Sequence, residues 1–413
     1  MKNILRMSFM AVVFLVVSCG KSENKEEEII HFPEVSNSLN DIKVKLGETF
    51  QIQGTGFSKD KEYVVTFEPN QKGKIIEITD KYLKVEVPQN AISGEITLTF
   101  NGKTKVVGTI IIQKEYELYA YRRDYTDMNN YLKQLVKIDV NTGNQTVVSN
   151  LEFEGAYFTD LIFSENERNI IGFIATPSNG TALLKVNIDT GKSKTVLLSD
   201  EQSISFNYLV KDDKGDMYAY RRDNVDMDNY LKQLVKIDAS TGNQTIVSSL
   251  EFEGTYFEDL VFDEKEKTIM GFTTTLSGGR SLLKVNMNTG KSTTTLLSDK
   301  QGINFDYLVK DDKGYIYAYR RDYTDMNNYL KQLVKIDKNT GNQTIVSNLD
   351  IEGTYFTDLV FDEEEKDIMG LTTTPSGSKI LLKVNVNTGK NTKILLSDKK
   401  EISFNDLIFI PKK

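Results

Sequence analysis

Short runs of alternating apolar and polar side chains begin at residue 33 and continue to the end of the chain. Near the N-terminus they include FQIQGTGF at 50–57, YVVTF at 63–67 and YLKVEVP at 82–88. A period of two over four to eight residues is typical of half-buried β-strands. We therefore predict an all-β protein, with a small β-sandwich over residues 33–112.

The rest of the chain, residues 113–413, repeats itself. The hexapeptide Tyr-Ala-Tyr-Arg-Arg-Asp occurs at 119–124, 218–223 and 317–322, with an offset of 99 residues both times. Each 99-residue unit divides again, because a phrase ending in Thr-Gly occurs six times, at steps of 48 and 51 residues. The lysines of this phrase are Lys137, Lys185, Lys236, Lys284, Lys335 and Lys383.

One half-unit, residues 157–198, predicts four short strands: YFTDLIF, NIIGFIA, ALLKVNI and KTVLL. The Thr-Gly pair falls between the third and fourth strands, where glycine can adopt the positive φ of a short hairpin loop. Four-stranded units of about 50 residues in radial repetition are typical of a β-propeller, and six copies predict six blades. A linear β-solenoid is the structural alternative.

The two ends of the repeat region predict how the ring closes. The first copy begins at its second strand, Glu117–Arg122, and the last copy ends after a first strand, Phe404–Ile410. Pairing these segments would complete a blade from both chain ends and remove the free sheet edges.

Two family resemblances accompany these patterns. The Leu-x-Lys-Ile-Asp-x-x-Thr-Gly phrase resembles NHL/YVTN-like propellers, and the absence of Trp excludes the WD signature. Residues 33–112 resemble the IPT/TIG family of immunoglobulin-like domains, which usually act as spacers or docking modules; another seven-strand sandwich is the alternative. The matching residues are Gly54-Thr55-Gly56-Phe57, Val87-Pro88, Gly94, Ile96, Leu98 and Phe100.

The N-terminus has the features of an export signal. Lys2 and Arg6 precede an apolar run from Met7 to Val17, which is too short to span a bilayer, so residues 1–18 are predicted to be a signal peptide. Cys19 follows directly, as in the lipobox of bacterial lipoproteins, where the thiol is lipidated; an ordinary signal peptide is the alternative. Residues 19–32 are then a charged, flexible tether.

Composition restricts the chemistry of the folded part. Among 413 residues there is one Cys, one His and no Trp, and the formal net charge is −8. Cys19 and His31 both lie in the leader and tether, which excludes a multi-histidine zinc site and a Ser-His-Asp arrangement in the folded part. The acidic balance argues against nucleic acid as a partner.

The first candidate site is the segment after Tyr-Ala-Tyr, which we expect to be a long loop on one propeller face. Arginine forks, carboxylates and tyrosine rings suit planar polar ligands such as a glycan, a peptide or a protein. Alternatively, these Arg–Asp pairs brace neighbouring blades. The candidate residues are Arg122, Arg123, Asp124, Tyr131, Arg221, Arg222, Asp223, Tyr230, Arg320, Arg321, Asp322 and Tyr329.

The second candidate site is a ring at the predicted mouth of the central channel, at the start of each innermost strand. It consists of Asp160, Tyr208, Asp259, Tyr307, Asp358 and Asp406. Converging carboxylates would suit Ca²⁺ or shared-proton acid/base chemistry. Alternatively, each Asp accepts backbone hydrogen bonds. We expect no resident cofactor, with Ca²⁺ as the one candidate ion.

These observations favour a non-catalytic lipoprotein of the bacterial outer membrane, surface-exposed or facing the periplasm. Its lipid would hold it in the membrane, and its propeller would bind a glycan or an envelope protein. A carboxylate-based polysaccharide hydrolase or lyase is the alternative, since glycosidic chemistry needs only two carboxylates. Three-fold repetition of the polar groups favours binding over a single catalytic centre. A scaffold subunit of an envelope complex is a third possibility.

Overall fold

The computed structural model describes residues 31–36, 40–113, 115–127, 131–155, 157–224, 230–252, 257–325, 329–349 and 356–412. The predicted signal peptide, Cys19 and most of the tether lie outside these residues. The chain divides into two compact units, residues 1–113 and 114–413. Within the described ranges, no helix is long and apolar enough to cross a membrane.

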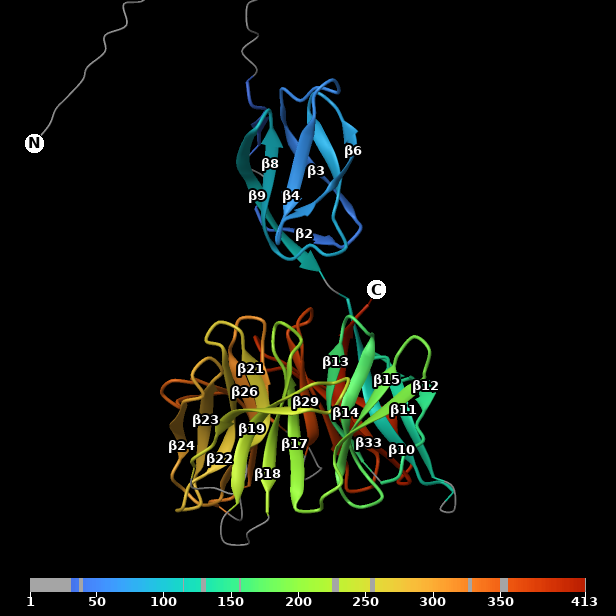
Figure 1. Ribbon diagram of the computed structural model, residues 1–413, viewed down its shortest axis with the longest axis vertical. Coiled ribbons are helices and arrows are strands. Elements are labelled where there is room, and N and C mark those ends of the chain that lie inside the picture. The colour runs from blue at the N-terminus through green and yellow to red at the C-terminus, as the bar shows by residue number, and fades with distance from the viewer. Residues whose placement is uncertain are drawn as a thin grey trace, which may run out of the picture. The chain divides into compact units, whose positions relative to one another are not determined.

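The N-terminal unit is a β-sandwich (Figure 1). Its two sheets have the strand orders β1-β3-β7-β6 and β2-β9-β8-β4-β5, and their facing side chains, such as Ile52, Leu83 and Leu98, form one apolar core. The strands are β1 (Glu34–Val35), β2 (Ile42–Lys45), β3 (Thr49–Thr55), β4 (Tyr63–Phe67), β5 (Gln71–Lys72), β6 (Lys74–Ile78), β7 (Tyr82–Glu86), β8 (Gly94–Phe100) and β9 (Lys103–Gln113).

The C-terminal unit is a β-propeller, whose described residues form six four-stranded antiparallel sheets, named blades A to F here (Figure 1). Blade A consists of β33, β10, β11 and β12 from the channel outward; blades B to F are β13–β16, β17–β20, β21–β24, β25–β28 and β29–β32. The strand bounds are β10 (Tyr116–Asp124), β11 (Leu132–Ile138), β12 (Gln145–Asn150), β13 (Phe158–Ser164), β14 (Asn169–Ala175), β15 (Thr181–Asn187), β16 (Ser193–Ser199), β17 (Ile204–Lys211), β18 (Met217–Asp223), β19 (Leu231–Ile237), β20 (Gln244–Ser249), β21 (Glu258–Asp263), β22 (Thr268–Thr274), β23 (Arg280–Asn286), β24 (Ser292–Ser298), β25 (Ile303–Lys310), β26 (Ile316–Asp322), β27 (Leu330–Ile336), β28 (Gln343–Asn348), β29 (Phe356–Asp362), β30 (Asp367–Thr373), β31 (Lys379–Asn385), β32 (Asn391–Ser397) and β33 (Ile402–Pro411).

The ring closes as the sequence predicts. The C-terminal strand β33 pairs antiparallel with β10 from Tyr116↔Pro411 to Asp124↔Ile402, and Figure 1 shows the red strand beside the green-blue one. Blade A thus combines the last strand of the unit, β33, with its first three strands, β10 to β12. The pairing of β33 with β10 joins the two ends of the propeller. The prediction of a six-bladed ring closed by its termini is confirmed.

The blades adhere through apolar layers, because each strand alternates its side chains between two buried faces. In blade A, Leu118 and Ala120 of β10 face blade F, whereas Tyr119 and Tyr121 face blade B. Tyr121 is fully buried and packs edge-on against Phe158, the phenylalanine that begins the innermost strand of blade B. The same tyrosine–phenylalanine contact recurs between blades C and D and between blades E and F.

The Thr-Gly turns also behave as predicted. Gly143 has φ 75°, and its N–H donates to the carbonyl oxygen of Asp139 at 2.8 Å. A Cβ atom on Gly143 would lie 2.2 Å from the carbonyl oxygen of Leu395 in the outer strand of blade F. Glycine is thus required at this position for two reasons: the backbone is left-handed, and the neighbouring blade approaches too closely for a Cβ atom.

Candidate functional site

The Arg-Arg-Asp triplets lie in strands and not in loops, which corrects the prediction. In blade A, Arg122, Arg123 and Asp124 are the last residues of β10, and the connecting loop begins only at Tyr125. Blades C and E repeat this arrangement at the ends of β18 and β26. We call the ends of the blades that carry these triplets the arginine face, and the opposite ends, which carry the Thr-Gly turns, the turn face.

The first arginine of each pair is held within its own blade. Arg122 donates to Asp124 at 2.8 Å and to Gln145 at 3.3 Å. Arg221 contacts Gln233 at 2.9 Å and Asp223 at 3.3 Å, and Arg320 donates to Asp322 at 2.8 Å. These arginines brace their own blades, whereas the structural alternative had the Arg–Asp pairs bracing neighbouring blades.

The second arginine of the pair differs between copies. In blade E, Arg321 makes a two-point ion pair with Asp306, with Nε and Nη2 at 2.7 and 2.9 Å from the carboxylate oxygens, and its third nitrogen donates to Tyr323. In blade A, an uncharged residue, Asn405, occupies the position of Asp306. Arg123 donates to the Asn405 amide oxygen at 3.0 Å, and its buried Nε has no hydrogen-bond partner among the described residues.

Tyrosine rings surround the second arginines. The Arg123 guanidinium lies 4.6 Å from the ring centre of Tyr157, which is 55% exposed, and 5.4 Å from that of Tyr125. Tyr125 stacks on Tyr131 at 5.1 Å. Blade E has the equivalent stack, Tyr323 on Tyr329 at 4.4 Å. In blade C, Asn224 replaces the first tyrosine, and Arg222 lies over Tyr230.

The six ring residues do converge at the centre of the propeller. They line one small cavity of about 170 Å³, which lies inside the channel. Five of them, Asp160, Tyr208, Asp259, Tyr307 and Asp406, have a positive φ, from 49° at Asp406 to 58° at Tyr307, because a β-bulge interrupts the innermost strand there. The expectation that they stand at strand starts holds approximately in blades B, D and F, where they are the second or third residue of the innermost strand, and is wrong in blades A, C and E, where they are the fifth.

Small residues make room for these bulges. In blade B, Asp160 and Leu161 lie opposite Gly172, where a Cβ atom would lie 2.6 Å from the carbonyl oxygen of Thr159. Gly271 occupies the same position in blade D, and alanine does so in blades A, C and E, whereas in blade F the bulged Asp358 lies opposite Leu371 and Gly370 pairs with Leu359. The bulge turns each Asp or Tyr toward the axis.

Hydrogen bonds run around the ring from blade to blade. The Asp406 carboxylate accepts from the backbone N–H of Asp160 at 2.9 Å. Asp259 accepts from the N–H of Tyr307 at 2.9 Å, and Asp358 from the N–H of Leu407 at 2.6 Å. These carboxylates therefore tie blade A to B, blade D to E and blade F to A.

Burial dominates the electrostatics of the ring. Removal from water raises the pKa of Asp160 to about 6, of Asp358 to about 7 and of Asp259 to about 8; for Asp406, burial and then the neighbouring Asp358 and Asp160 raise the pKa well above its ordinary value. Among the described residues, no group of three or more His, Cys, Asp or Glu side chains is placed to hold a metal ion. Binding of Ca²⁺ by this ring stays a prediction without geometric support.

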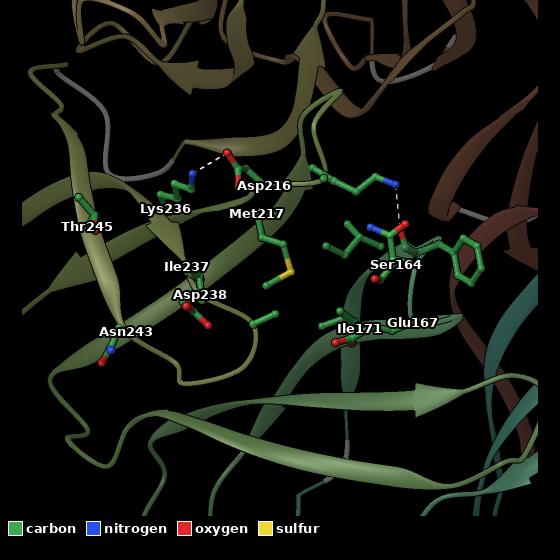
Figure 2. A pocket seen from close by; sticks show the side chains of 16 residues that line it. Ser164, Glu167, Ile171, Asp216, Met217, Lys236, Ile237, Asp238, Asn243 and Thr245 are labelled. Atoms are coloured by element: carbon green, nitrogen blue, oxygen red, sulfur yellow. Dashed lines mark hydrogen bonds and ion pairs between the residues drawn. The ribbon is translucent and has the colours of Figure 1, made fainter. Parts of the chain in front are cut away.

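A third feature was not anticipated from sequence. A cavity of about 590 Å³ opens at the turn face between blades B and C, and Figure 2 shows its lining. Ile171, Met217 and Ile237 form its apolar part, and these side chains belong to the layer between the two blades. Polar groups at the ends of the strands, such as Ser164 and Asn243, form its rim.

Comparison with known proteins bears on the fold. TolB from Acinetobacter baumannii is 12% identical, over 85% of this chain and 83% of TolB, with a TM-score of 0.54. The propeller fold is shared with TolB. A protein of unknown function from Bacteroides thetaiotaomicron is 15% identical over 88% of this chain and 98% of its own, with a TM-score of 0.46. An auxiliary nutrient binding protein from Bacteroides ovatus is 12% identical over 90% and 100%, with a TM-score of 0.39.

No protein-family model matches the chain. No curated protein matches it either. The IPT/TIG resemblance of residues 33–112 and the NHL/YVTN resemblance of the repeats therefore stay predictions, while the sandwich and the propeller are described by the structure itself.

Proposed function

We propose that the protein is a non-catalytic lipoprotein of the bacterial cell envelope whose arginine face binds a carboxylate-bearing partner. An acidic glycan is the favoured ligand, and an acidic segment of an envelope protein is the alternative. The observation that carries the proposal is the contrast between Arg123 and Arg321. The same guanidinium is neutralised by Asp306 in blade E and faces the uncharged Asn405 in blade A.

The surroundings of Arg123 suit such a ligand. A guanidinium presents two parallel N–H donors to a carboxylate, and Asp306 shows this mode of pairing at the equivalent position. The exposed ring of Tyr157 beside the guanidinium offers an amphipathic face on which a sugar ring can pack. Charge, planarity and an aromatic surface thus meet at one site of the arginine face.

Catalysis is less well supported. The ring carboxylates, which would be the catalytic pair of a glycosidase, accept backbone hydrogen bonds and line a cavity of only about 170 Å³. Ligand pockets usually enclose about 300–1,000 Å³. A polysaccharide chain would not reach these carboxylates.

We expect Arg123→Ala to weaken binding of polygalacturonate by at least tenfold, because the ligand carboxylate loses its paired donors. Asn405→Asp should do the same while keeping the arginine, since it supplies the internal carboxylate that Arg321 already has. Asp306→Asn should instead release Arg321 and strengthen binding. Isothermal titration of the purified protein with polygalacturonate, and with uncharged dextran as the control polymer, measures these effects.

Arg122→Ala is a less informative variant because that arginine braces β10. Equal binding by the wild-type protein and the Asn405→Asp variant would refute the arginine site. Binding of an acidic peptide but not of polygalacturonate, with the same dependence on Arg123 and Asn405, would assign the site to the protein partner.

The membrane anchor gives a separate test. We expect Cys19→Ala to move the protein from the membrane fraction to the soluble fraction, because a diacylated cysteine contributes roughly 0.8 kcal/mol for each buried CH₂ group. Fractionation and mass spectrometry of the N-terminal peptide check this. An unmodified Cys19 in the mature protein would contradict the lipoprotein assignment, and Ser18→Ala serves as the control.

A further inference from the structure

The cavity between blades B and C breaks the internal repetition of the propeller. Two other blade pairs, D with E and F with A, are related to it by shifts of 99 residues, so each lining position can be compared with its copies. Among those copies, Ala239 corresponds to Lys338 and Val140, and Ser164 corresponds to Asp263 and Asp362. The comparison shows what opens the cavity.

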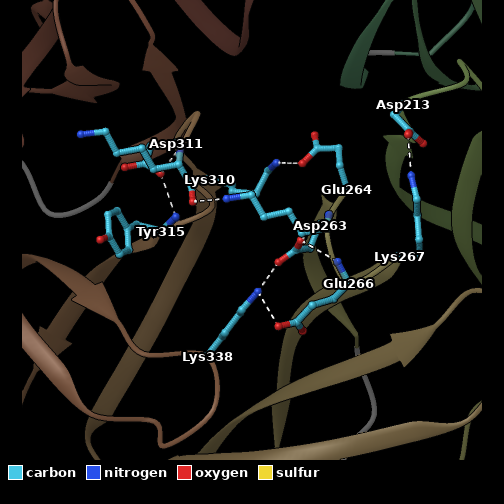
Figure 3. Close-up of polar contacts among 11 residues, drawn as sticks. Asp213, Asp263, Glu264, Glu266, Lys267, Lys310, Asp311, Tyr315 and Lys338 are labelled. Carbon is cyan, nitrogen blue, oxygen red and sulfur yellow. Dashed lines mark hydrogen bonds and ion pairs between the residues drawn. The ribbon is translucent and has the colours of Figure 1, made fainter. Parts of the chain in front are cut away.

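At the D–E interface the equivalent space holds the side chain of Lys338. Its ammonium pairs with Asp263, which is almost fully buried, and with Glu266 at 2.9 Å (Figure 3). At the F–A interface Val140 packs against the apolar layer. Between blades B and C, Ala239 and Ser164 remove both members of the Lys338–Asp263 pair, and the space they leave is the cavity of Figure 2.

The charged groups at the rim are already paired. Lys211 contacts Glu165 at 2.6 Å, Lys236 contacts Asp216 at 2.5 Å, and the rim carboxylate Glu167 contacts Lys185 at 2.6 Å. Hydrogen bonds from Ser240 and Thr241 stabilise the charged Asp238 carboxylate and lower its pKa to about 2. Each of these charges has a partner within the protein, so this wall does not select for an ion.

The remaining lining has two characters. Ile171, Met217 and Ile237 give an apolar wall, and Ser164, Asn243 and Thr245 bring hydroxyl and amide groups to the rim. A sugar ring combines an apolar C–H face with hydroxyl groups that both donate and accept hydrogen bonds. The cavity volume of about 590 Å³ falls within the usual range for small-molecule sites, roughly 300–1,000 Å³.

We propose that the B–C cavity is a binding site for a small uncharged polyhydroxyl ligand, one or two sugar units in size. This site is separate from Arg123, since it lies at the opposite ends of the strands, and it does not depend on the proposed function of the arginine face. Two lining positions, Ser164 and Ala239, depart from both of their copies, so neither the D–E nor the F–A interface presents the same lining.

The repeats supply matched variants for the test. Ser164→Asp with Ala239→Lys rebuilds the ion pair of the D–E interface in the B–C cavity. Asp263→Ser with Lys338→Ala opens the D–E interface in the same way. Both combinations already occur in this fold, so both proteins should fold, which circular dichroism and thermal unfolding would verify.

The probes are glucose, galactose, mannose and N-acetylglucosamine, titrated into the protein while NMR chemical shifts of isotope-labelled methionine methyl groups, including that of Met217, are recorded. We expect at least one sugar to shift the Met217 signal saturably. The Ser164→Asp/Ala239→Lys protein should bind it at least tenfold more weakly, and Asp263→Ser/Lys338→Ala should gain a second response at Met270, whose position corresponds to Ile171. Arg123→Ala should bind these sugars like the wild type.

Three results would overturn the proposal: no saturable shift with any of the four sugars, sugar binding unchanged by Ser164→Asp/Ala239→Lys, or a response to butylammonium in place of the sugars. The last would show that the cavity selects an alkylammonium group like the side chain of Lys338.

Discussion

Deleting residues 402–413 is expected to abolish folding of the propeller. These residues contain β33, the innermost strand of blade A, whose backbone pairs with all of β10. Without it, β10 becomes an exposed edge at the centre of the ring, and exposed edges invite pairing with other chains. The truncated protein should elute as an aggregate in size-exclusion chromatography and lose its cooperative thermal transition.

The expected size of the effect follows from where β33 places its side chains. Phe404 and Leu407 are buried in the layer between blades F and A, and Ile410 is buried in the layer between blades A and B. Truncating a single buried phenylalanine typically costs about 3–5 kcal/mol. Since whole domains are stable by only about 5–15 kcal/mol, losing the entire strand exceeds what the ring can tolerate.

Phe404→Ala gives a graded version of the same experiment, with an expected loss of about 3–5 kcal/mol in urea unfolding followed by circular dichroism. Leu395→Ala is the control, because Leu395 lies on an outer strand, is 56% exposed and should change stability by less than about 0.5 kcal/mol. A Phe404→Ala protein as stable as the control would mean that closure by β33 contributes little.

The fold could be predicted because the repeats specify it redundantly. Each strand pattern occurs several times, and the missing first strand of the first copy matches the surplus strand of the last. The predicted positions of the ring residues were wrong where the local backbone geometry departs from that of a regular strand. Asp160 and its equivalents are predicted at strand starts, but in blades A, C and E the innermost strand begins four residues earlier; the bulge at Asp160 depends on Gly172 in the next strand.

The candidate site was predicted less completely, for a different reason. The three Arg-Arg-Asp triplets are identical, so the sequence predicts three equivalent sites. The residues that make the three sites differ lie elsewhere in each blade. The Asn405–Arg123 contact joins residues 282 positions apart, and the Lys338–Asp263 pair joins residues 75 apart. Aligning the 99-residue units exposes the differences at Ala239 and at Asp306, whose copies Asn207 and Asn405 are uncharged, but only the assembled blades show which partners those differences remove or add.

The stability of the propeller should fall as the pH rises from about 5 to 9, and Asp259 should account for much of the fall. Burial raises the pKa of Asp259 to about 8, whereas an aspartate in an unfolded chain titrates near 3.9. Between these values the native state binds more protons than the unfolded state, so the free energy of unfolding decreases with rising pH. The stabilisation is complete below about pH 4 and is lost as the pH passes through about 8.

Replacing Asp259 by Asn removes this linkage and keeps an oxygen that can accept the Tyr307 N–H. We expect Asp259→Asn to be more stable than the wild type at pH 9 by a few kcal/mol, since each unit of pKa difference corresponds to about 1.4 kcal/mol. At pH 5 the difference should shrink to roughly 1.5 kcal/mol, because the carboxyl is then protonated in the native state and already ionised in the unfolded chain. Urea unfolding at pH 5, 7 and 9, followed by tyrosine fluorescence and circular dichroism, measures the difference.

Asp238→Asn is the matched control. Asp238 lies in a Thr-Gly turn at which blades B, D and F already carry asparagine, and hydrogen bonds from Ser240 and Thr241 lower its pKa to about 2. A group with a lowered pKa stabilises the native state above the unfolded pKa and loses that effect only as the pH falls toward 2, so this variant should track the wild type between pH 5 and 9. Parallel loss of stability in the Asp259→Asn and wild-type proteins over this range would show that the ring carboxyls are ionised in the folded channel, and that hydrogen bonds from the neighbouring blades offset the cost of their burial.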